Sequence, residues 1–135
     1  MNRQEIINRL LDHYEHPRNR EVLADADIVQ AGGQPECSDT LTLYLAVAHE
    51  DDTVERLTFE GQGCTVSQAA ASILTEFVPG KTLSELEQFD HQAMIDMLGR
   101  EVVSTRIRCA TLALTTLKQA IQAYRRTHRN KAASL

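Results

Sequence analysis

The spacing of apolar and polar residues divides this chain into a first half with one helix and a few strands and a helical second half. Apolar residues at three- and four-residue intervals predict an amphipathic helix over residues 4–15, which Pro17 ends because the residue before a proline disfavours the helical region. Leucine and valine alternate with smaller or polar residues over 39–47, a pattern typical of a half-buried strand. After a polar turn, residues 54–60 supply a second strand, and the two form an antiparallel hairpin.

Helical signals dominate the chain after this hairpin. An alanine-rich helix is predicted over 66–78, and it stops at Pro79 and Gly80, which together are a common helix stop. A long last helix is expected to run to about Arg126. The side chains placed to cap the later helices are Thr82, Asp90, and either Ser104 or Thr105.

Residues 21–36 show little periodicity. A third strand is weakly indicated near residues 28–30, and the breaker cluster at 31–35 predicts a mobile loop that leads to Cys37. The order of these elements predicts an α+β fold. It begins with one helix, continues with a small antiparallel sheet of about three strands, and ends with several helices packed on one face of the sheet.

The composition is typical of one soluble domain with an aliphatic core. Hydrophobic residues make up 42% of the 135 positions, but there is no tryptophan and only 4% are aromatic, so small and aliphatic side chains must fill the core. We expect residues 1–126 to form a single domain, as a monomer or a weak homo-oligomer, and residues 127–135 to form a basic, frayed tail. The net charge of −5 argues against general nucleic-acid binding. Without an apolar run of roughly 20 residues or a signal-peptide segment, we expect a cytoplasmic protein with no membrane partner.

All three cysteines lie at predicted element boundaries. Cys37 precedes the first clear strand, Cys64 lies between the second strand and its helix, and Cys109 lies near the start of the last helix. An odd number of cysteines in a reducing compartment is more typical of metal ligands or reactive thiols than of a disulfide framework. Because scattered core cysteines would more often fall inside elements, these three are placed to converge at one end of the domain.

Cys64 has the local setting of a reactive thiol. Gly61 and Gly63 permit backbone angles that other residues avoid, so we expect them to present Cys64 at an exposed turn next to a helix N-terminus. The partial positive charge there favours the thiolate, which is both a nucleophile and a ligand for soft metals. A buried structural cysteine beside a β–α turn is the alternative for this residue.

Asp39 is the fourth candidate ligand. It lies two residues after Cys37, and side chains two apart along an extended segment point the same way. Three thiolates and one carboxylate are enough for a tetrahedral metal site, and thiolates suit zinc or iron–sulfur clusters. On these residues alone, three unrelated buried thiols and a surface aspartate are the alternative.

Five stretches of the chain match one protein family in the same order. They are Asp12-His13-Tyr14-Glu15-His16-Pro17-Arg18-Asn19, Pro35-Glu36-Cys37-Ser38-Asp39, the segment from Phe59 to Ser72, Gly80-Lys81, and Arg106-Ile107-Arg108-Cys109-Ala110-Thr111-Leu112. On these stretches the chain resembles the U-type iron–sulfur assembly proteins, namely IscU, SufU and the N-terminal part of NifU.

The resemblance implies the same α+β fold and a carrier with no turnover of its own. The implied ligands of zinc or of a transient 2Fe–2S cluster are Cys37, Asp39, Cys64 and Cys109. Sulfur would come from a cysteine desulfurase of the IscS or SufS type, and the cluster would pass to apo iron–sulfur proteins or carriers. Either Cys64 or Cys109 would accept persulfide sulfur, and Arg108 would sit beside the site and stabilise the thiolates.

Three departures leave the branch of the family open. Ser38 replaces the glycine that usually separates the first cysteine from the aspartate, and Arg108 replaces the histidine of the IscU branch, as in SufU. SufU proteins carry a longer insertion between the second and third cysteines, whereas this chain is compact there, as IscU is. Val102–Arg106 stands where IscU has its chaperone-recognition motif. The sequence therefore predicts a cluster assembly scaffold, with a SufU-like zinc-dependent sulfurtransferase that activates a desulfurase as the alternative.

Overall fold

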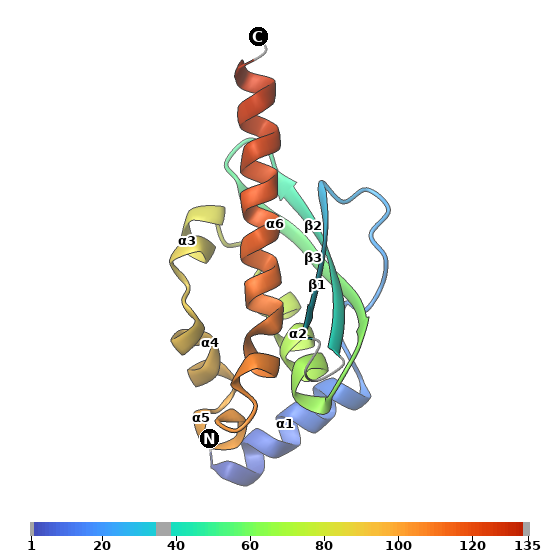
Figure 1. The fold of residues 1–135 in the computed structure, drawn as a ribbon, viewed down its shortest axis with the longest axis vertical. Coiled ribbons are helices and arrows are strands. Elements are labelled where there is room, and N and C mark those ends of the chain that lie inside the picture. The colour runs from blue at the N-terminus through green and yellow to red at the C-terminus, as the bar shows by residue number, and fades with distance from the viewer. Residues whose placement is uncertain (1, 35–38, 134–135) are drawn as a thin grey trace.

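The computed structural model describes residues 2–34 and 39–133, which form a three-stranded antiparallel sheet and the helices packed against it (Figure 1). The strands are β1 (Ile28–Gln34), β2 (Asp39–Ala48) and β3 (Thr53–Gln62), and the helices are α1 (Arg3–Glu15), α2 (Thr65–Phe77), α3 (Leu83–Gln88), α4 (His91–Leu98), α5 (Arg100–Val103) and α6 (Ile107–Ala133). Helix α6 packs on β1 and β2, and α2 packs on β3, α6 and α1. The predicted α+β class is confirmed. Within the described ranges, no helix is both long and apolar enough to cross a membrane.

Strand β2 lies at the centre of the sheet and carries much of the core. Its alternate residues from Asp39 to Val47 are buried, as the period of two along a strand predicts. Leu43 lies opposite Phe59 of β3, and both side chains are fully buried beneath the helices. Such cross-strand apolar pairs hold the register, because a slip by one residue would turn every core side chain toward the opposite face.

Strand β1 is longer than the sequence pattern indicated. The predicted loop over 31–34 is wrong, because these residues pair with β2 and Gly32 lies opposite Leu41. Gly32 is required by the approach of helix α6, since a Cβ atom at this position would lie 2.1 Å from Thr116 Oγ1. Glycine here allows close packing rather than a turn. The rest of the predicted loop, including Cys37, lies outside the described residues.

Two of the predicted helix caps are confirmed and one is wrong. Thr82 Oγ1 accepts a hydrogen bond from Glu85 N at 3.1 Å, and Asp90 Oδ1 accepts one from Ala93 N at 2.8 Å. The last helix begins at Ile107, beyond Ser104 and Thr105, because the short helix α5 occupies the stretch before it. Its far end also differs, since α6 continues to Ala133 rather than stopping near Arg126. The frayed tail over 127–135 stays a prediction.

A buried polar junction fixes α1 to α2. His13 Nδ1 lies 2.7 Å from Ser72 Oγ, and the backbone N–H of Arg18 donates to the same hydroxyl at 2.9 Å. Burial lowers the pKa of His13, and the positive charge of Arg18 acts in the same direction. A neutral imidazole can accept the Ser72 proton at Nδ1, so the Ser72 hydroxyl both donates and accepts a hydrogen bond in the junction. The junction holds in place the helix whose N-terminus carries Cys64.

Candidate metal centre

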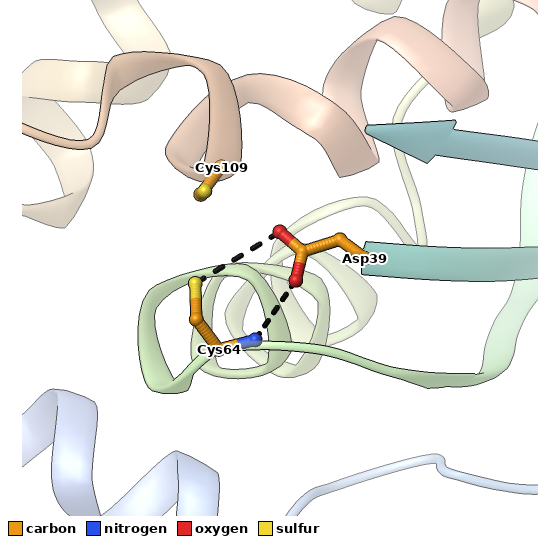
Figure 2. A group of neighbouring side chains, drawn as sticks. All are labelled: Asp39, Cys64 and Cys109. Atoms are coloured by element: carbon orange, nitrogen blue, oxygen red, sulfur yellow. Dashed lines mark hydrogen bonds between the residues drawn. The ribbon is translucent and has the colours of Figure 1, made fainter. Parts of the chain in front are cut away.

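Three of the predicted ligands meet at one end of the fold. Asp39 is the first residue of β2, Cys64 precedes the first residue of α2, and Cys109 is the third residue of α6. One ligand atom from each, a carboxylate oxygen or a sulfur, lies within 4.8 Å of the other two. Figure 2 shows the Asp39 carboxylate between the two sulfur-bearing elements. A single metal ion can therefore contact all three side chains after small adjustments.

The strand register creates this convergence. Thr40 pairs with Gln62, so the start of β2 lies beside the end of β3, where the chain turns into α2. Cys64 is thereby brought next to Asp39 although 24 residues separate them in the sequence. Helix α6 packs on both β2 and α2, and this packing places Cys109 over the same point. The three side chains therefore lie close together because of tertiary packing and not because of any local motif.

Asp39 is buried and oriented by hydrogen bonds. Only 2% of the surface of this residue is exposed. Oδ1 accepts a hydrogen bond from the backbone N–H of Cys64 at 2.9 Å, and Oδ2 lies 3.9 Å from Cys64 Sγ, which donates to it (Figure 2). The alternative of a surface aspartate is therefore wrong. A buried carboxylate is costly unless it is hydrogen-bonded or coordinates a cation, and the two contacts from Cys64 meet this need in the absence of a metal. Its place beside two thiols also makes it available as a metal ligand.

Cys64 caps helix α2. Its backbone is extended, with φ −71° and ψ 167°, and its Sγ accepts from the backbone N–H of Ser67 at 3.5 Å. The residue is half-buried rather than displayed on an exposed turn as predicted. Gly63 is not among the glycines with positive φ, so the expected unusual backbone angle is absent there. Cys64 is half-buried because its backbone N–H and its sulfur both face the Asp39 carboxylate.

The cap gives Cys64 a structural role that can be separated from metal binding. Cys64→Ser keeps an N-cap acceptor, whereas Cys64→Ala leaves the Ser67 N–H without one. In metal-free protein we expect the alanine variant to be less stable than the serine variant by about 1 kcal/mol in urea unfolding. Both variants are expected to lose zinc affinity alike. Equal stability of the two would show that the sulfur is not acting as a cap.

Cys109 and Arg108 differ in their surroundings. Cys109 is only 1% exposed, and Arg108 has an exposed side chain. Cys109 belongs to the group of three side chains that could hold a metal ion, whereas the effect of Arg108 on the thiolates stays a prediction. Cys37 lies outside the described residues, so its part in the site also stays a prediction.

The donor set fits one class of metal. Two sulfur atoms and one carboxylate oxygen are ligands for zinc or for an iron–sulfur cluster, whereas magnesium and calcium take oxygen ligands alone. A fourth ligand would complete a tetrahedral site, and the sequence offers Cys37 two residues before Asp39.

Residues 5–131 match the family model of the NifU-like N-terminal domain. The chain belongs to this family. The NifU-like match covers nearly the whole chain, as the sequence motifs predicted, and the family resemblance is confirmed.

Relatives of this NifU-like chain include both branches considered above. The iron–sulfur cluster assembly scaffold protein IscU 1 of Archaeoglobus fulgidus is 34% identical over 117 residues, which are 87% of this chain and 74% of the relative. The zinc-dependent sulfurtransferase SufU of Bacillus subtilis is 30% identical over 129 residues, covering 83% of this chain and 86% of SufU. The crystal structure of FiSufU, a SUF-system protein of Fervidobacterium islandicum AW-1, has a TM-score of 0.71 at 25% identity, covering 89% of this chain and 99% of FiSufU.

Proposed function

We propose that this chain is an iron–sulfur cluster assembly scaffold. It binds iron and accepts sulfur from a cysteine desulfurase. An external electron donor reduces this sulfur to sulfide, and the chain then builds a transient 2Fe–2S cluster and passes it to apo-proteins. The observation that carries the proposal is the meeting of Asp39, Cys64 and Cys109 within 4.8 Å at one end of a NifU-like fold. The similarity to IscU scaffolds over most of the chain supports the same function.

Sulfur enters through a cysteine that a donor can reach. Cys64 is half-buried whereas Cys109 is almost fully buried, so Cys64 is the better acceptor of the two. Its thiolate attacks the terminal sulfur of a persulfide on the donor enzyme. A new S–S bond forms on Cys64, the S–S bond of the donor breaks, and the donor cysteine leaves as a thiolate. The transfer needs no outside oxidant or reductant. The proton on Cys64 passes to the nearby Asp39 Oδ2 or to water.

Asp39 makes the site easy to empty. A carboxylate is a harder ligand than a thiolate and is less suited to a sulfide-rich cluster. We expect Asp39→Ala to lengthen the lifetime of the reconstituted cluster about tenfold, which is an effect of about 1.4 kcal/mol on the barrier to loss. The decay of visible absorbance under air measures the lifetime.

Asp27→Ala is the matched control for this substitution. Asp27 Oδ2 also accepts a backbone N–H, that of Val47 at 2.8 Å, but it lies at the opposite end of β2 from Asp39. The control therefore loses a carboxylate and its contacts with Val47 N and His49 Nε2 without touching Asp39, Cys64 or Cys109. Equal cluster lifetimes in Asp39→Ala and in the unaltered chain would contradict a role for Asp39 in release.

A zinc-dependent sulfurtransferase is the second candidate function. It is favoured by the similarity to SufU of Bacillus subtilis and by Arg108, which replaces the histidine of the IscU branch with a side chain that cannot be a neutral ligand. In that case zinc is held permanently, and the chain accepts persulfide and activates its desulfurase without building a cluster.

Metal analysis of anaerobically purified protein distinguishes the two functions. The expected result for a scaffold is iron with acid-labile sulfide, and a 2Fe–2S absorbance after incubation with iron, cysteine, a thiol reductant and a desulfurase. One tightly held zinc per chain, with persulfide uptake and faster desulfurase turnover, would instead support the sulfurtransferase. A protein that holds zinc and never accepts persulfide would contradict both.

A further inference from the structure

We infer that Gly63 is a positioning residue for the metal centre, because only a residue without a side chain lets the Asp39 carboxylate close on Cys64. The inference rests on the proposed role of Asp39 as a ligand. Gly63 itself contributes no ligand atom and lies one residue before Cys64.

The space beside Gly63 is filled by the site. A Cβ atom at this position would lie 2.2 Å from Asp39 Oδ1 and 2.8 Å from Asp39 Cγ. It would also lie 2.6 Å from Ser67 Oγ. All of these separations are shorter than carbon and oxygen atoms tolerate without a bond, so either the carboxylate or the loop has to move.

The lack of room for a side chain, and not the backbone conformation, explains why glycine is needed at position 63. Gly80 and Gly99 have φ values of 90° and 113°, in the region that glycine favours, whereas Gly63 is not among the positive-φ glycines. Alanine at position 63 would therefore be free of backbone strain. The contacts that such a methyl group would make at unallowed distances are with Asp39 and Ser67.

Displacing Asp39 disrupts the ligand geometry in two ways. The hydrogen bond from Cys64 N to Asp39 Oδ1, 2.9 Å long, fixes the plane of the carboxylate. This bond also directs Oδ2 toward Cys64 Sγ, 3.9 Å away. A methyl group at position 63 pushes on Oδ1, so it breaks the first contact and turns the second oxygen away from the sulfur atoms. Loss of a group that orients a ligand typically lowers metal affinity by roughly 10- to 100-fold.

A double-mutant cycle tests whether Gly63 acts through Asp39. Zinc affinity is measured by competition with a chelator for the full chain, for Gly63→Ala, for Asp39→Ala and for the double variant. We expect Gly63→Ala to weaken zinc binding roughly 10- to 100-fold in the unaltered chain. In the Asp39→Ala background we expect it to have almost no further effect, because the group it displaces is already gone.

Cobalt substitution gives a second readout that does not depend on affinity. The visible ligand-field bands of bound cobalt report the ligands, so the spectrum of Gly63→Ala is expected to resemble that of Asp39→Ala and to differ from that of the unaltered chain. Gly33→Ala is the matched control. Its Cβ atom would lie 3.3 Å from the backbone oxygen of Asp39, a tight contact that a shift of a few tenths of an ångström relieves, and no carboxylate atom is within 4 Å of it. We expect zinc affinity and the cobalt spectrum of this control to be unchanged.

Three results would overturn the inference. The first is zinc affinity in Gly63→Ala equal to that of the unaltered chain. The second is an equal loss with and without the Asp39 carboxylate, which would mean that position 63 acts on the fold. The third is failure of the unaltered chain to bind zinc or cobalt at all. This last result would also refute the proposed metal site, whereas the first two results would leave the proposed metal site intact. If Gly63→Ala does not fold, Gly63→Ala with Ser67→Ala removes the second clash, and the same cycle is run on that pair.

Discussion

Replacement of Cys109 by serine is expected to weaken zinc binding by roughly 100-fold while the chain stays folded. A structural zinc site is worth about 10–16 kcal/mol in total, so one of four ligands accounts for about 3 kcal/mol, and serine is a poor substitute for a thiolate. The serine side chain is nearly the same size as that of cysteine, so we expect the packing around position 109 to be kept. Competition with a chelator measures the affinity, and urea unfolding of the metal-free variant measures the fold.

Thr111→Ser provides the control for this experiment. Thr111 is buried on the same helix, and its hydroxyl donates to the Ile107 carbonyl rather than joining the ligand group. We expect its zinc affinity to match that of the unaltered chain. If Cys109→Ser also binds zinc normally, Cys109 is a core cysteine and not a ligand.

Replacement of Phe59 by alanine is expected to lower the free energy of unfolding by about 3–5 kcal/mol. Phe59 has no exposed surface, pairs with Leu43 in the centre of the sheet and leaves a large cavity when truncated. Urea unfolding of metal-free protein measures the loss. Val29→Ala is the control, because Val29 is 59% exposed and its truncation is expected to change stability by less than about 0.5 kcal/mol.

Added zinc is expected to offset the stability that Phe59→Ala loses, if the proposed site binds it. A ligand that binds only the folded chain stabilises it, by about 2.7 kcal/mol at a concentration of 100 times the dissociation constant. The Phe59→Ala variant is therefore expected to regain much of its stability when zinc is added. A loss of less than about 1 kcal/mol in the metal-free variant would contradict the central place of Phe59 in the core.

Periodicity predicted the elements whose signals are local. The helix over 4–15, the alternating strand over 39–47 and the caps at Thr82 and Asp90 depend on residues close together in the sequence, and the structure contains all of them. The positions of the cysteines at element boundaries could also be predicted, because glycine and proline mark those boundaries.

The errors arise where distant segments override local preference. Residues 31–34 have the composition of a loop, but the neighbouring strand β2 supplies their hydrogen-bond partners and α6 packs closely on Gly32. The short helix α5, which delays the start of α6 to Ile107, packs on α4 and on the distant helix α1. No periodic signal is long enough in these segments to decide between alternatives.

The sequence by itself determined the chemistry of this protein, because side-chain type decides which atoms can bind a soft metal or accept sulfur. It supplied Asp39, Cys64 and Cys109 as candidates and the family motifs that contain them. Only the tertiary structure decided that these atoms meet, since the register of β2 on β3 and the packing of α6 set their separation. The same packing gave Gly63 its importance, because the Asp39 carboxylate that fills the space beside it comes from a strand that is remote in the chain.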